Sequence, residues 1–166
     1  MLTNVKEELN RFAKYVISQS RANLTRGKKN SSKELYNSLD SNVKVSKNSF
    51  ELTFLMEEYG VFQDKGVSGV KKKYNTKFAY TNKMPPPAKL DKWIVRKGIA
   101  PRDKKGKFIS RKSLQFMIAR SIFNNGIKPS LFFTKPFEKA FKNIDKDLIK
   151  AYKLDVETLI DNSINN

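Results

Sequence analysis

The chain has 166 residues, of which 39% are hydrophobic and 30% are charged, and its formal net charge is +18. A chain of this length normally folds as one domain with a sizeable core. It contains neither cysteine nor histidine, which excludes disulfides, the usual zinc sites and histidine acid–base chemistry. We therefore predict that it is not an enzyme, with no catalytic residues, no metal and no cofactor.

Membrane insertion is not expected either. The longest apolar runs reach four or five residues, far short of the ~20 that cross a bilayer. The N-terminus has no apolar stretch typical of a secretory signal. We expect a chain made in the cytoplasm of its host, with no membrane partner.

The first part of the chain predicts a helix. Apolar residues recur at three- and four-residue steps from Val5 to Ile17, which is the period of an amphipathic helix. Asn4 is the expected N-cap. The expected end lies at 23–27, before a polar loop.

A short helical turn and a β-hairpin are predicted next. Ser31 and Glu34 have the spacing of a capping box, which places a helical turn at 31–39. Residues 43–45 and 50–56 alternate between apolar and polar types. That period of two predicts antiparallel strands with one covered face.

The positive charge is concentrated between Lys65 and Lys112. These 48 residues include 16 basic residues but only two acidic ones, Asp91 and Asp103, so +14 of the net charge lies there. Such a concentration favours an acidic partner, either a nucleic acid or an acidic protein surface. A solvated lysine-rich face is the alternative. We expect residues 66–87 and 101–109 to be projecting basic loops.

Three further helices are predicted from local signals. Prolines 85–87 open one that Gly98 ends, and another begins after Ser110 and ends at Gly126. The last covers residues 134–162. The expected fold class is therefore α+β: a small antiparallel sheet packed by three to four helices, with an inserted basic arm or loop and a long C-terminal helix, in a single domain of residues 1–166.

One common core is expected, because the apolar side of each periodic element should face the same interior. Its expected members are Phe50, Leu52, Phe54, Trp93, Ile118, Ile122, Phe137 and Phe141.

One hypothesis of enzymatic activity rests on the carboxylates near the second predicted strand. Glu57, Glu58 and Asp64, together with Lys65, could in principle form a metal-dependent nuclease site. Their spacing matches no nuclease motif, and solvated acids at a strand end are the preferred interpretation.

The basic region interleaves lysines with aromatics, and this pattern suits a surface that neutralises phosphates and stacks on bases. The alternative is that the aromatics only pack against one another. No phosphate-binding glycine loop and no common nucleic-acid-binding motif is present. The candidate residues for binding a partner or DNA are Lys71, Lys72, Lys73, Lys77, Arg102, Lys104, Lys105, Lys107 and Arg111.

Three blocks of the sequence are informative through their order. They read EYGVFQDKGVSG (58–69), WIVRKGI (93–99) and GIKPSLFF (126–133). In this order, and with the elements around them, the chain resembles the neck or tail-completion proteins of tailed bacteriophages, which form connector rings between head and tail. The corresponding elements are Val5–Ala22, Leu35 with Ser38, Val43–Met56, a strand end at Tyr59–Gly66, a loop at Gly66–Pro87, Leu90–Gly98 and Ser113–Phe133.

The resemblance implies a structural virion protein at the head-to-tail junction. It implies a homo-oligomeric ring of six or twelve copies around the genome channel, in contact with the portal or with adjacent neck and tail rings. Contact with packaged DNA would be possible there. The alternative is a non-enzymatic nucleic-acid-binding protein that uses residues 65–112.

The chain departs from the family pattern at two places. Where the family has threonine–glycine before a leucine, this chain has Lys33 and Glu34, so the conformation of that turn is open. The basic loop and the C-terminal helix are also enlarged, which suggests additional contacts.

Overall fold

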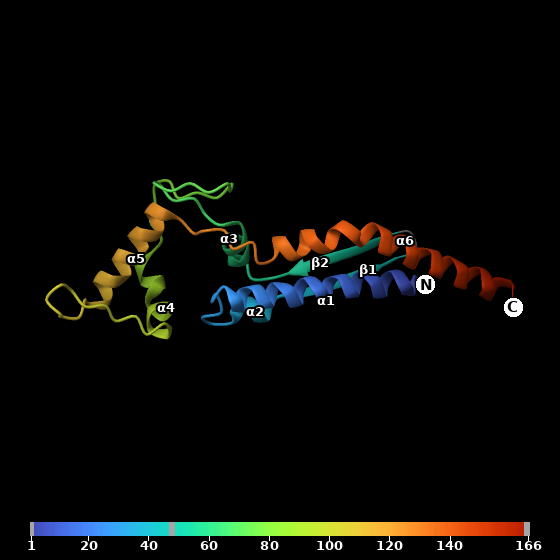
Figure 1. Cartoon of the computed structure of the whole chain (residues 1–166), viewed down its shortest axis with the longest axis horizontal. Coiled ribbons are helices and arrows are strands. Elements are labelled where there is room, and N and C mark those ends of the chain that lie inside the picture. Colours follow the sequence, from blue (N-terminus) through green and yellow to red (C-terminus); the bar gives the residue numbers. More distant parts are fainter. Residues whose placement is uncertain (1, 47–48, 165–166) are drawn as a thin grey trace. The chain divides into compact units, whose positions relative to one another are not determined.

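The computed structural model describes residues 2–46 and 49–164 and divides into two compact units. One comprises Met1–Glu57 and Phe132–Asn166, and the other is the intervening Glu58–Leu131. We call them the first and second unit. The architecture is α+β with a two-stranded antiparallel sheet and a long C-terminal helix (Figure 1), which confirms the predicted fold class.

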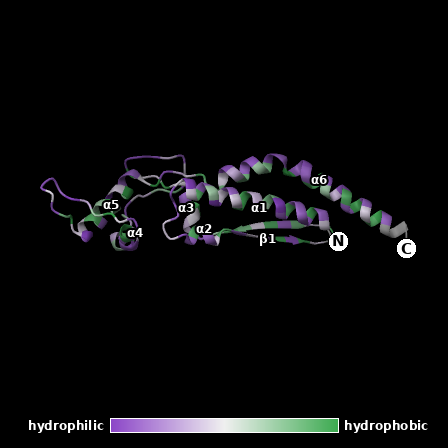
Figure 2. Cartoon of the chain, turned by 60° about the horizontal axis from the view of Figure 1, so that its bottom comes forward, coloured by the Kyte–Doolittle hydropathy of each residue, from purple (hydrophilic) through white to green (hydrophobic). Residues whose placement is uncertain are grey.

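Two long helices and a hairpin build the first unit. Helix α1 (Thr3–Arg26) is followed by a short α2 (Glu34–Ser38), and α6 (Thr134–Ile164) completes the unit from the other end of the chain. Strands β1 (Asp40–Val45) and β2 (Phe50–Leu55) pair in antiparallel register. Helices α1 and α6 lie side by side along the hairpin (Figure 1), because both are amphipathic, as their alternating colours in Figure 2 show.

The core of the first unit lies between these elements. Phe12 and Val16 of α1 pack with Ile144 of α6, and the half-buried Leu52 and Phe54 of β2 close this cluster. The ring of Phe54 meets those of Phe12, Phe133 and Phe137 at centroid distances of 5.2–6.3 Å. The fully or nearly fully buried apolar residues of this unit are Val5, Leu9, Phe12, Ala13, Val16, Leu24, Leu35, Leu39, Phe132, Ile144 and Ala151.

Both N-terminal caps differ from the predictions. Helix α1 begins at Thr3, so Asn4 lies inside it, and its backbone N–H is bound instead by the carboxylate of Asp155 in α6. Helix α2 begins at Glu34 after Lys33, which has a positive φ of 58°, and no side chain caps it. The Ser31 hydroxyl makes no capping bond and is enclosed.

The second unit consists of short elements. Helix α3 (Tyr59–Lys65) is followed by a 3₁₀ turn η1 (Pro87–Leu90), α4 (Asp91–Arg96) and α5 (Arg111–Asn125). The predicted ends of α5 are confirmed. The Ser110 hydroxyl accepts a hydrogen bond from the Ser113 N–H, and Gly126 ends the helix with φ of 71°.

Two expectations are wrong at the level of elements. Residues Tyr59–Lys65 form a helix, not the end of a strand; Gly66, with φ of 75°, ends it. The single common core is also not present. Phe50, Trp93 and Phe141 are 49%, 38% and 53% exposed, and Ile118 and Ile122 belong to the second unit.

Among residues 2–46 and 49–164, no helix combines the length and apolar character that crossing a membrane requires.

Candidate interaction surfaces

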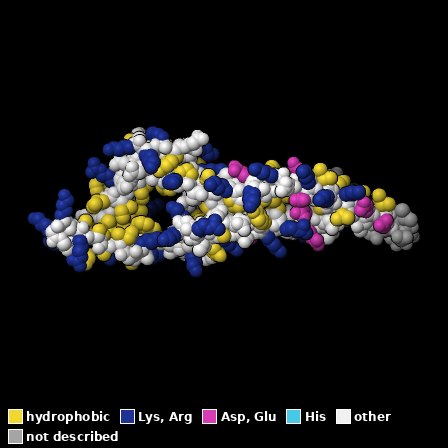
Figure 3. All heavy atoms as spheres, in the orientation of Figure 1, with side chains coloured by type: hydrophobic (Ala, Val, Ile, Leu, Met, Phe, Trp, Pro, Cys, Tyr) yellow, Lys and Arg dark blue, Asp and Glu magenta, His cyan; other side chains and the backbone are white. Residues whose placement is uncertain are grey.

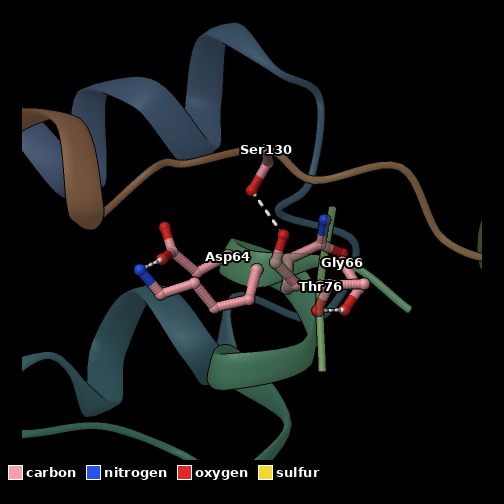
Figure 4. A network of polar contacts seen from close by, with 6 residues as sticks. Asp64, Gly66, Thr76 and Ser130 are labelled. Carbon is pink, nitrogen blue, oxygen red and sulfur yellow. Dashed lines mark hydrogen bonds and ion pairs between the residues drawn. The ribbon is translucent and has the colours of Figure 1, made fainter. Parts of the chain in front are cut away.

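The first and last of the three sequence blocks come together in the second unit. Val67 and Ile127, 60 residues apart, exchange backbone hydrogen bonds of 2.9 and 2.8 Å. The carbonyl of Gln63 accepts bonds from both the N–H and the hydroxyl of Ser130. Figure 4 draws the bond from the Ser130 hydroxyl. We call residues 63–69 and 126–131 together the clasp.

Glycine is required in the clasp because the two chain segments touch at their backbones. A Cβ atom added at Gly126 would overlap the carbonyl oxygen of Val67, and one at Gly69 would overlap the carbonyl of Asn124. At Gly66 it would lie 2.6 Å from both the Ile127 oxygen and Pro129. Gly66 and Gly126 also have positive φ values, which glycine adopts without steric cost.

Ser68 connects the clasp to the segment that follows it. This residue is 4% exposed. Its hydroxyl accepts from the Tyr74 N–H and donates to the Tyr74 carbonyl, and its backbone bonds to Phe78 and Tyr80. The Thr76 hydroxyl donates to the Gly66 carbonyl (Figure 4). The expected projecting loop at 66–87 therefore starts as a folded, buried part of the unit.

The first group of candidate residues, Lys71 to Lys73, lies on a turn at the C-terminal end of α5. The N–H groups of Lys71 and Lys72 donate to the Asn124 carbonyl, and the Lys73 ammonium donates to the Gly69 carbonyl. All three side chains are exposed. The turn thus holds three cations at the surface.

The second group lies on the turn at 101–109, which precedes α5. Arg102 and Phe108 pair across this turn, and the guanidinium carbon lies 3.8 Å from the ring centroid. The Asp103 carboxylate accepts from the N–H groups of Lys105 and Lys107 at 2.8 and 2.9 Å. The exposed Lys104, Lys105 and Lys107 are therefore presented by an ordered turn.

The nine candidates do not form one cluster. Lys71–Lys73 and the turn at 101–109 lie at opposite ends of α5, whose 15 residues span about 20 Å. Arg111 forms an ion pair with Asp91 at 3.6 Å, an acid that also accepts from Gln115. Arg111 thus connects α5 to α4, and two separate basic patches remain.

Lys77 borders an aromatic cleft in the second unit that the sequence did not reveal. The cleft has a volume of about 610 Å³. Phe62 and Phe78 form part of its wall, edge to face at 4.8 Å, and the Lys77 ammonium lies 5.3 Å from the Phe78 centroid. Burial raises the pKa of the Tyr80 phenol. The lining residues are Tyr59, Phe62, Gln63, Val67, Lys77, Phe78, Ala79, Tyr80 and Ile127.

One polar atom of this cleft is notable. The side-chain Nε2 of Gln63 is enclosed and has no hydrogen-bond partner among the described residues. A buried amide without a partner costs free energy. Within the described part of the chain, the Gln63 amide is thus an unsatisfied polar group enclosed in the wall of the cleft.

The acids of the nuclease hypothesis give it no support. Asp64 is 4% exposed in α3 and has Lys65 at 3.9 Å, whereas Glu57 and Glu58 are exposed. Within the described part of the chain, no three acidic side chains gather into a group able to hold a metal ion.

Comparison of the chain with protein-family models, with curated proteins and with solved structures yields no match.

Proposed function

We propose that this protein is a non-catalytic structural subunit of a bacteriophage head-to-tail junction, where copies associate as a ring of six or twelve around the genome channel. Its neighbours would be the portal or an adjacent neck or tail ring, and its final location the virion. The proposal starts from the order of sequence blocks that resembles the neck and tail-completion proteins.

The observation that carries the proposal is the clasp. The blocks at 58–69 and 126–133 are the parts of the resemblance that contain the most glycine and aromatic residues. They are far apart in sequence and yet bond to each other backbone to backbone. If the resemblance of these two blocks to the neck proteins were due to chance, the blocks would not be expected to contact each other in the fold. Their contact therefore supports the proposal.

The form of the first unit also supports a structural role. A ring needs two different surfaces on each subunit, since a head-to-tail contact is heterologous and must close on itself. A 31-residue helix and a hairpin with an exposed outer face provide extended surfaces for such contacts. The exposed Leu55 on the outer face of β2 is one candidate contact.

The test is the mass of the assembled particle. Native mass spectrometry and light scattering on the full chain should give six or twelve copies, and negative-stain images should show rings with a central opening. The same protein should be found in virions in a multiple of six. A strictly monomeric chain that is also missing from virions would overturn the proposal.

Nucleic-acid binding is the second candidate function. It is favoured by the composition of the second unit, which contains 18 basic and four acidic residues. Binding through phosphates would weaken steeply with salt. A filter-binding titration at several salt concentrations tests it, and affinity that does not change with salt would exclude it.

A further inference from the structure

The outer side of α6 presents an apolar stripe that its own unit does not cover. Ile149, Tyr152, Val156 and Ile160 follow one another at steps of three and four residues, which places them within about 80° of arc on the helix. Ile149, Tyr152 and Ile160 are 70%, 54% and 52% exposed. A stripe at this spacing is the form in which a helix enters a groove on another protein.

This part of α6 is acidic, although the molecule as a whole is strongly basic. After Lys153 the chain contains Asp155, Glu157 and Asp161 and no basic residue. Asp155 is used within the unit, whereas Glu157 and Asp161 are exposed. In Figure 1 the end of α6 extends past the start of α1. The end of the helix is therefore both apolar and acidic.

The aromatic cleft of the second unit has the complementary properties. Its walls are aromatic and aliphatic, and Lys77 adds a positive charge. An apolar, acidic helix end supplies side chains for the walls and carboxylates for Lys77.

We propose that the end of α6, led by Ile160, docks in the aromatic cleft of a second copy of this chain. The inference rests on the proposed function in one respect, namely that copies associate. It adds the two surfaces that meet. One surface lies on the first unit and the other on the second, so the contact is heterologous, and repeating it gives a ring or a filament.

A second copy of this chain is the favoured occupant of the cleft, because one chain contains both the basic unit with the cleft and the acidic, apolar helix end that fits it. The second unit has a net charge of +14, whereas the part of α6 after Lys153 contains three acidic residues and no basic one. Opposite charges guide association and set its orientation. The α6 helix rises about 45 Å over its 31 residues, so its end is well separated from Thr134, where the chain arrives from the second unit.

Cysteine cross-linking tests the contact directly, since the chain has no cysteine of its own. Copies with Ile160→Cys are mixed with differently tagged copies with Ala79→Cys, a residue that lines the cleft. Mild oxidation should join the two tags at least tenfold more than in the matched control, where Thr53→Cys on the exposed face of β2 replaces Ala79→Cys. Ile160→Asp should weaken association of the full chain by about tenfold or more, the fold-change expected when one buried aliphatic contact is lost.

The possible outcomes distinguish a failure of the proposed contact from a failure of the proposed function. If rings form but the Ile160→Cys and Ala79→Cys copies cross-link no better than the control, the proposed contact is wrong while the proposed ring is unaffected. An unmodified chain that stays monomeric would overturn both. A chain with both cysteines that joins only within itself would place α6 in its own cleft and overturn the second copy as occupant.

Discussion

Asp155 connects the C-terminal helix to the first turn of α1. Its carboxylate accepts hydrogen bonds from the backbone N–H groups of Asn4 and Val5 at 2.9 and 3.0 Å, and from the Asn4 side chain at 2.9 Å. The residue is 3% exposed. A negative group at a helix N-terminus satisfies unpaired N–H groups and interacts favourably with the helix dipole.

Asp155→Asn should therefore destabilise the protein by about 1–2 kcal/mol, the usual range for a lost cap and charge–dipole interaction. Glu157→Gln is the matched control, because Glu157 is exposed on the same helix and its ion pair with Lys153 is long, at 3.8 Å. That control should change stability by less than about 0.5 kcal/mol. Urea unfolding at neutral pH measures both variants.

The same carboxylate makes stability depend on pH. Burial acts to raise the pKa of Asp155, but hydrogen bonds from Asn4 and Val5 outweigh it, so the net shift is downward. The folded pKa then lies below the unfolded value of about 3.9. Its contribution is fully present above the unfolded pKa and is lost as the pH falls through the folded pKa. The difference in unfolding free energy between wild type and Asp155→Asn should therefore become smaller in acid. A difference that becomes larger in acid would contradict this assignment.

Lys33 has a strained backbone in the turn before α2. Its φ of 58° is in the left-handed region, and its side chain is exposed. An L-residue there costs roughly 1–2 kcal/mol more than glycine. Lys33→Gly should thus stabilise the first unit by about 1 kcal/mol, whereas Lys29→Gly, which is exposed and has no positive φ, should not. Thermal unfolding of the two variants would decide, and equal changes would argue against strain.

Among the elements, the clasp gives the sharpest test. Gly126 and Gly106 both have positive φ, 71° and 79°, but only Gly126 is crowded; a Cβ at Gly106 meets nothing within 4 Å. Gly106→Ala should cost only about 1 kcal/mol, from backbone conformation. Gly126→Ala should cost clearly more, over about 2 kcal/mol, because the Val67 backbone must also move. Amide exchange at Val67 and Ile127 should accelerate in Gly126→Ala alone.

The elements predicted well are those with local signals. Ser110 and Gly126 determine the ends of α5 through hydrogen bonds and dihedral angles within a few residues. The hairpin follows from alternation, and the C-terminal helix from its apolar period and length. Such signals are present in the sequence itself, so reading them requires no knowledge of the remainder of the fold.

Other features depend on contacts that no local pattern reveals. The cap of α1 comes from Asp155, about 150 residues away, so a nearby Asn4 was the natural but wrong choice. Periodicity identified an apolar side at Trp93 and Phe54, yet it could not show that they belong to different units. Phe141 stacks on Phe137 and is 53% exposed, although Ile144 and Ala151 further along α6 are buried.

The candidate site was partly predictable for the same reason. Exposed lysines are recognisable from composition, and all nine candidates lie on the surface of the second unit, although Arg111 also forms an ion pair with Asp91. The aromatic cleft was not predicted. Its wall joins Phe62, Phe78 and Ile127, which only the clasp brings together. The enclosed amide of Gln63 leaves no signal in the sequence.

For the whole molecule, charge is divided unequally. The second unit has a net charge of +14 and the first +4, counted over the full chain. Figure 3 shows Lys and Arg spread over the second unit, while Asp and Glu gather along the first. This distribution suits subunits that meet through unlike surfaces.

Neutralising six lysines should separate the two candidate functions. The residues changed to Gln are Lys71, Lys72, Lys73, Lys104, Lys105 and Lys107. The fold should survive, because exposed charges contribute little to stability. If the basic turns contact a neighbouring ring, assembly onto heads should fail. If they hold DNA, rings should still form, with a salt slope lower by about one unit per lost phosphate contact.

We expect the assembly defect, because a genome channel favours passage over tight binding. Electron microscopy of particles made with the variant, together with DNA titrations, distinguishes the results. Normal particles with a flattened salt dependence would instead favour the nucleic-acid-binding function.

The clasp has a consequence for how such a chain can change. The carbonyls of Gln63 and Asp64 accept from the N–H groups of Ser130 and Leu131, so the second unit starts and finishes at nearly the same point. A segment with adjoining ends can be exchanged for a shorter or longer one at small entropic cost, since closure entropy grows only with the logarithm of length. The first unit can thus stay unchanged while the segment between the two parts of the clasp is replaced by one that fits a different neighbouring protein.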